Sequence, residues 1–96
     1  ELNWNEFAQP NQTLVFYMGL NGLETICKQL KHYGMDASMP IALIEKGTSD
    51  RQRVFTGDLD SLPNIVRAAE AKAPTLIIVG HVVSLHNKLA WFNLNN

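Results

Sequence analysis

One stretch sets the architecture of this chain: Thr13-Leu14-Val15-Phe16-Tyr17-Met18-Gly19-Leu20-Asn21-Gly22. Its large residues run without a strongly polar break, a pattern typical of a strand buried on both faces. A glycine turn follows, and Asn21 with Glu24 resembles a helix N-cap with its capping-box partner. In an open α/β sheet a ligand usually binds beyond the carboxyl end of such a strand, but a plain strand-to-helix junction has the same pattern.

Composition indicates one domain of ordinary globular character. The chain has 96 residues, 46% hydrophobic and 18% charged, with a formal net charge of −1. The lack of a basic excess argues against a nucleic-acid surface. No apolar run approaches the ~18 residues of a membrane span, and no signal peptide is visible. The single cysteine, Cys27, excludes an internal disulfide and fits a buried thiol in a reducing, cytoplasmic compartment.

Hydrophobic periodicity and turn residues divide the chain into helices and strands. The helical period is clearest after the opening strand, where it predicts a helix ending near Tyr33 with Gly34 as its C-cap. The predicted elements are a helical turn and linker (1–12), a strand (13–18), a helix (23–33), strands (41–45 and 52–56), a helix (62–73), a strand (75–80) and a helix (85–92). His81-Val82-Val83 would extend the last strand.

Chain connections then fix the strand directions. The strand 13–18 leads to 41–45 through a helix, so the two should run the same way. A hairpin reverses 52–56, and the next helix leads into 75–80 in the direction of 52–56. The unbroken apolar strand 75–80 should be central, which predicts an α/β fold with flanking helices and a mixed sheet in the order 13–18, 75–80, 41–45, 52–56.

The first strand is then anomalous. In the predicted order, 13–18 lies at an edge of the sheet, yet it is too apolar for an exposed edge. We therefore expect a further strand from outside this chain to pair with it, as in a lobe of a larger protein.

The predicted directions bring three segments to one edge of the sheet. Met18 ends the first strand, Gly47 follows the second, and Thr75 begins the last. Glycine lets a backbone approach a ligand closely, and N–H and C=O groups at strand ends can bind a heterocycle. A ligand site built from Met18, Gly47 and Thr75 is predicted there, with Gly80-His81 at the opposite edge. Taken alone, Met18 could equally fill a gap in the core.

Other polar residues form weaker patterns. His81 and His86 lack carboxylate or cysteine partners at ligand spacing, so no metal site is predicted. Arg51 and Arg53 alternate on a predicted edge strand, where solvated side chains are expected and contacts to substrate carboxylates are the alternative.

Several segments, taken together, resemble one known family. They are 13–19 (TLVFYMG), 39–49 (MPIALIEKGTS), 52–54 (QRV), 76–83 (LIIVGHVV) and 88–92 (KLAWF). Their order and spacing resemble the C-terminal lobe of the uroporphyrinogen-III C-methyltransferases, also found as the methylase half of siroheme synthases, within the tetrapyrrole methylase superfamily. The resemblance runs from about Glu1 to Phe92. It implies that 1–12 is a leader or linker from a missing N-terminal lobe and 13–96 the C-terminal α/β lobe.

The resemblance implies a two-lobed enzyme that transfers methyl groups from S-adenosylmethionine to carbons 2 and 7 of uroporphyrinogen III. The product, precorrin-2, leads to siroheme or cobalamin. The donor would lie between the lobes of each subunit of a homodimer, with Met18 and Gly47 as donor-binding positions; Thr75 is added from topology alone.

The N-terminal lobe of that family carries a Gly-rich donor loop, a Gly-Gly-Asp motif and the proposed acid and base, and nothing in this chain matches them. No catalytic residue is assigned here, and the isolated chain is expected to be inactive. Two alternatives stay open: a lobe of another precorrin methyltransferase, and a non-catalytic α/β module that binds a small ligand or mediates dimerisation.

Overall fold

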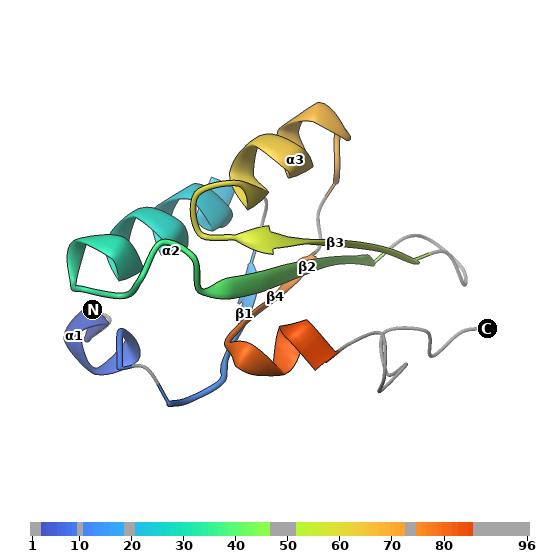
Figure 1. Cartoon of the computed structure of the whole chain (residues 1–96). Helices are drawn as coiled ribbons and strands as arrows, with labels where there is room; N and C mark the ends of the chain where they lie inside the picture. Colours follow the sequence, from blue (N-terminus) through green and yellow to red (C-terminus); the bar gives the residue numbers. More distant parts are fainter. Residues whose placement is uncertain (1–2, 10, 19–20, 47–51, 73–74, 86–96) are drawn as a thin grey trace.

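The computed structural model describes residues 3–9, 11–18, 21–46, 52–72 and 75–85 (Figure 1). Its elements are α1 (Trp4–Phe7), β1 (Leu14–Met18), α2 (Asn21–His32), β2 (Pro40–Lys46), β3 (Gln52–Asp58), α3 (Leu62–Ala68), β4 (Thr75–Val79) and the 3₁₀ helix η1 (His81–Leu85). The helical turn near the start, the two longer helices and the four strands are therefore confirmed. Gly47 and most of the predicted helix 85–92 lie outside the described residues.

The order and directions of the strands agree with the prediction. The sheet has the order β1-β4-β2-β3, with β4 inside and β3 at an edge. Because strands of opposite direction alternate in this order, all three neighbouring pairs are antiparallel. The sheet is therefore antiparallel rather than mixed: β1 and β2 run the same way, as predicted, but β4 separates them.

The sheet has two faces of different composition, because side chains alternate along each strand. One face packs with α1, α2 and α3 into the larger core cluster, to which the sheet contributes Ile41, Leu43, Ile77 and Val79. The other face forms a smaller cluster of Ala42, Ile44, Ile78 and Val83, the last from η1. Figure 1 shows α2 and α3 on the opposite side of the sheet from η1.

β1 is buried on one face only. Leu14 and Phe16 pack against the larger cluster, and the Phe16 ring lies 6.2 Å from that of Trp4 and 6.0 Å from that of Phe7. Val15 and Tyr17, on the alternate positions, are 58% and 73% exposed. The prediction that this strand is buried on both faces is wrong. The sequence run is apolar on both faces, but only α1 and α2 of the described elements cover β1, and both lie on one side.

The predicted C-cap of α2 is confirmed. Gly34 has a φ of +106°, which glycine adopts without steric cost. Its N–H donates to the carbonyl of Lys31 at 3.1 Å, and the Met35 N–H donates to the carbonyl of Leu30 at 2.9 Å. This hydrogen-bond pattern is a Schellman motif, which satisfies carbonyls at the helix end and buries Met35 against the core.

α3 ends with the same motif but without a glycine. Glu70 has a φ of +54°, its N–H donates to the carbonyl of Arg67, and the Ala71 N–H donates to the carbonyl of Val66. A left-handed conformation costs an L-residue roughly 1–2 kcal/mol, and glycine avoids this cost. Glycine also makes the unfolded chain more flexible, which cancels part of the gain in stability. We expect Glu70→Gly to raise the free energy of unfolding by about 0.5–1 kcal/mol in urea denaturation of the full-length protein.

Gly34→Ala is the matched control for Glu70→Gly, because both residues occupy the same position of the motif. It should lower the free energy of unfolding by about 1 kcal/mol. If Glu70→Gly lowered stability as well, backbone strain at Glu70 would be excluded.

β4 ends at Val79 and does not continue through His81-Val82-Val83, as the sequence had suggested. Gly80 turns the chain with a φ of +144°, and a Cβ there would lie 3.0 Å from the carbonyl oxygen of Gln12. The Val83 N–H then donates to the Gly80 carbonyl, within the turn that opens η1. The turn at Gly80 therefore ends the strand, and the close approach to Gln12 leaves little room for a side chain at this residue.

Cys27 is a core residue, as predicted, and 2% exposed. Burial raises the pKa of its thiol to about 11, so at pH 8 the thiolate fraction is about a hundredfold below that of a thiol with the ordinary pKa of 9.0. We expect Cys27 to react with a disulfide reagent more slowly than a solvent-exposed cysteine by at least that factor. Reaction at the rate of an exposed thiol would show that α2 opens readily from the sheet.

Candidate functional site

The end of β1 and the start of β4 meet at one rim of the sheet. The register pairs Met18 of β1 with Thr75 of β4, and Thr75 with Glu45 of β2. Lys46 ends β2 at the same rim. The structure thus brings together two of the three predicted site residues, while Gly47, the residue after Lys46, lies outside the described part of the chain.

The opposite rim holds Gly80, as expected from the strand directions. The Gly80 N–H donates to the carbonyl of Pro40, where β2 begins, at 2.9 Å. Leu14 at the start of β1 pairs with Val79 at the end of β4. The two rims are therefore separated by the length of β4, and a ligand at one would not contact the other.

Thr75 is a buried polar residue with no exposed surface. It lies between Met18 and Glu45 in the sheet, and it has an interaction partner within the chain. Its position supports the rim from within the protein rather than offering a free hydroxyl to a ligand in solution.

Glu45, a charged residue at this rim, was not predicted as a site residue. Its Oε1 accepts a hydrogen bond from Arg53 Nε at 2.6 Å, and its Oε2 accepts from an Arg53 guanidinium nitrogen at 3.0 Å. Oε2 also accepts from the backbone N–H of Lys72 at 2.6 Å. Glu45 is only 8% exposed, so its charge is neutralised by Arg53 and by a backbone donor.

Two patterns in the sequence could have identified this pair. Glu45 follows Ile41 and Leu43 at alternate positions, which places it on the core side of β2. A hairpin between β2 and β3 then places Arg53 opposite it. Arg53 was expected as a solvated edge residue; its side chain is half exposed, but its guanidinium is fixed to Glu45 and lies 5.2 Å from the centre of the Phe55 ring.

Hydrogen bonding from Arg53 lowers the pKa of Glu45, against the opposing effect of burial. A lowered pKa in the folded state means that the ionised carboxylate stabilises the fold above its ordinary pKa of 4.5. That contribution is lost as the pH falls through the folded-state pKa. At neutral pH Glu45 is therefore an anion held by three donors.

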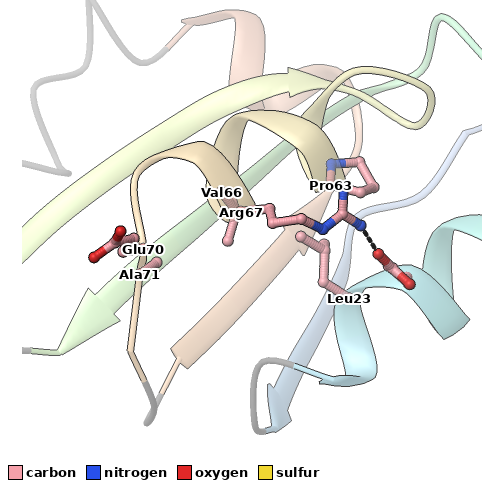
Figure 2. Close-up of a pocket in the computed structure, with 7 residues that line it drawn as sticks. Leu23, Pro63, Val66, Arg67, Glu70 and Ala71 are labelled. Carbon is pink, nitrogen blue, oxygen red and sulfur yellow. Dashed lines mark hydrogen bonds and ion pairs between the residues drawn. The ribbon is translucent and has the colours of Figure 1, made fainter.

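A cavity of about 460 Å³ opens between α2 and α3 on the helical face. Leu23, Val66 and Ala71 are its buried apolar lining, and Figure 2 shows Arg67 extending from α3 to the ion pair with Glu24 of α2. Two lining residues of the cavity are close in sequence to residues of the rim. Leu23 follows shortly after Met18, and Ala71 comes shortly before Thr75. The charged lining residues of the cavity are Glu24, Arg67 and Glu70.

The described part of the chain contains neither a membrane-spanning helix nor a cluster of metal-binding side chains. None of its helices is long and apolar enough to cross a membrane. Over the same residues, the histidine, cysteine and carboxylate side chains form no group of three or more that could hold a metal ion.

Comparison with known proteins defines the class. The chain belongs to the tetrapyrrole (corrin/porphyrin) methylases, whose family model matches residues 1–63. It is similar to the siroheme synthase of Nitrosomonas europaea, at 53% identity over 93 residues, and to that of Pseudomonas putida, at 58% over 91 residues. These alignments cover 97% and 95% of this chain but 20% of each relative, so the chain spans about a fifth of the curated relatives it matches.

Solved structures agree with this class. A uroporphyrin-III C-methyl transferase from Thermus thermophilus, complexed with S-adenyl homocysteine, is 27% identical with a TM-score of 0.70. The match covers 88% of this chain and 37% of that one. A cobalt precorrin-4 methyltransferase shares the fold, with a TM-score of 0.74 at 13% identity over 85% of this chain and 34% of that one.

Proposed function

We propose that this chain forms one wall of the methyl-donor site in an S-adenosylmethionine-dependent methyltransferase that acts on uroporphyrinogen III. The observation that carries the proposal is the rim at which Met18 pairs with Thr75 and β2 ends. The relative from Thermus thermophilus, complexed with S-adenyl homocysteine, supports a donor of this type.

At this rim, most contacts with the donor would be made by backbone atoms. Met18 and Gly47 would contact the donor where the chain leaves β1 and β2, and Gly47 has no side chain to keep the donor from the backbone. Thr75, buried between the two strands, would support both ends from below. A rigid wall of this kind orders the donor before the reaction, which lowers the entropic cost of aligning the methyl group with the attacking carbon.

The remaining chemistry would be supplied from outside this chain. Methyl transfer from a sulfonium to carbon needs an in-line approach and a base for the displaced proton. This chain would supply orientation alone, so we propose that an N-terminal lobe completes the site and that the isolated chain does not turn over.

The edge position and exposed apolar side chains of β1 support the presence of a further strand beside it. β1 is an edge strand of the described sheet, and its Val15 and Tyr17 are largely exposed. An apolar edge of this kind is rarely left open to solvent. We propose that a strand from the remainder of the polypeptide pairs with β1 in the full-length, homodimeric protein.

The direct test is methyl transfer by the full-length protein. With S-adenosylmethionine and uroporphyrinogen III, two methyl groups should be transferred per substrate molecule, giving precorrin-2, as mass spectrometry would show. Transfer only to a later precorrin would assign the chain to a different methyltransferase of the same family. A protein that binds no donor would contradict the proposal altogether.

A further inference from the structure

The Glu45 carboxylate joins three separate segments of the chain. It belongs to β2, its partner Arg53 belongs to β3, and the Lys72 N–H belongs to the connection between α3 and β4. Arg53 also approaches the carbonyl of Ala69, at the end of α3, with a guanidinium nitrogen at 3.5 Å. One buried carboxylate and its arginine partner thus link β2 and β3 to the residues that follow α3.

The other ion pairs of the described residues have a different environment. Lys31 and Asp60 pair at 2.6 Å with side chains 37% and 62% exposed, and Glu24 and Arg67 are each at least 60% exposed. Water and salt screen such pairs, so they contribute little. The Glu45 side chain is only 10% exposed. Removing its partner would leave a desolvated charge, so the Glu45–Arg53 geometry is strongly favoured.

Glu45 also lies at the proposed donor rim. It pairs across the sheet with Thr75, and it immediately precedes Lys46-Gly47 in the sequence. The Lys72 N–H that it binds follows Glu70 and Ala71, which line the cavity between α2 and α3. Any change in the position of the Glu45 carboxylate would therefore move the end of β2 and the approach to β4 relative to each other.

We infer that Glu45, held by Arg53, is a positioning residue of the donor site. Without contacting the donor itself, it fixes the end of β2 against the segment that leads into β4. This role rests on the proposed function, because it assumes that the donor binds at this rim. Loss of the carboxylate frees both segments, so the donor must order them when it binds and its affinity falls.

The test measures donor affinity in the full-length protein with S-adenosylhomocysteine as the probe, by titration calorimetry. Glu45→Gln keeps the shape of the side chain but removes the charge that holds Arg53. We expect the dissociation constant to rise about tenfold, because the lost interaction corresponds to one charge-assisted hydrogen bond. At saturating donor, kcat should fall as well, because a loosened wall aligns the methyl group with the attacking carbon less well.

Asp60→Asn is the matched control. It removes an ion pair of the same 2.6 Å length, formed by Asp60 with Lys31, away from the proposed donor rim. Its donor affinity should equal that of the unmutated protein, whatever its effect on thermal stability. Arg53→Lys keeps the positive charge but cannot bind both carboxylate oxygens in the same planar geometry, so its affinity should fall between those of Glu45→Gln and the unmutated protein.

The possible results distinguish a failure of the positioning role of Glu45 from a failure of the proposed function. If the unmutated protein binds the donor and folded Glu45→Gln binds it equally well, Glu45 is structural only and the inference is wrong. If Glu45→Gln does not fold, Arg53→Lys decides the question by the same measurement. If the unmutated protein binds no donor, the proposed function fails first, and the positioning role with it.

Discussion

Ile77→Asp is expected to prevent this chain from folding. Ile77 has no exposed surface, and in the sheet it lies between Phe16 of β1 and Leu43 of β2. An aspartate there would bury a charge among apolar side chains, at a cost of several kcal/mol even after relaxation. Natural domains are stable by only about 5–15 kcal/mol, so the full-length variant should lose the cooperative thermal transition of this part of the protein.

The control for this substitution is Thr25→Asp, which adds the same carboxylate at an exposed position in the first half of α2. A negative charge near a helix N-terminus is tolerated, so this variant should melt close to the unmutated protein. A folded Ile77→Asp protein with an unchanged transition would mean that β4 is not an inner strand of the sheet.

Gly47→Val is expected to raise the dissociation constant of S-adenosylhomocysteine by about 10- to 100-fold, since crowding a close contact costs roughly 1–3 kcal/mol. Gly47 follows Lys46, the last residue of β2, at the rim where Met18 and Thr75 pair. A side chain on this residue would occupy the space proposed for the donor. The chain should still fold, because the described strand β2 ends at Lys46, before the substituted residue.

Gly57→Ala serves as the control, because it should change stability and not donor affinity. Gly57 lies in β3 beside Ile41, toward the rim away from Met18, and a Cβ there would lie 2.7 Å from Ser61 Oγ and 3.3 Å from Ile65 Cδ1. This variant should lower the melting temperature while leaving donor affinity unchanged. Unchanged donor affinity in folded Gly47→Val protein would remove Gly47 from the donor site.

The strand order could be predicted because it follows from short connections and from one strand with no polar residue inside it. The hairpin after Glu45 fixes the direction of β3, and the run Leu76-Ile77-Ile78-Val79 requires a position with neighbours on both sides. The same reasoning failed for β1, where Val15 and Tyr17 are exposed. The sequence of a strand indicates which of its faces are apolar enough to be buried. Whether such a face is buried depends on the elements that pack against it.

The pairing of Met18 with Thr75 at one rim was predicted, but the contacts that support this rim were not. Strand directions place Met18 and Thr75 at one rim, because the direction of each strand determines where it ends. The hydrogen bond from Lys72 to Glu45 joins residues far apart in the sequence, and no periodic pattern reveals such a contact. The turn at Gly80 was missed for a similar reason, because it depends on the backbone at Gln12.

Hydrogen–deuterium exchange of the full-length protein, with and without S-adenosylhomocysteine, tests most directly where the donor lies. Backbone amides around Met18 and in the segment after Glu45 should exchange more slowly when the ligand is bound. Amides at the other rim, around Leu14 and Gly80, should be unaffected. Slower exchange confined to Leu14 and Gly80, with none at Met18, would contradict a donor site at the carboxyl ends of β1 and β2.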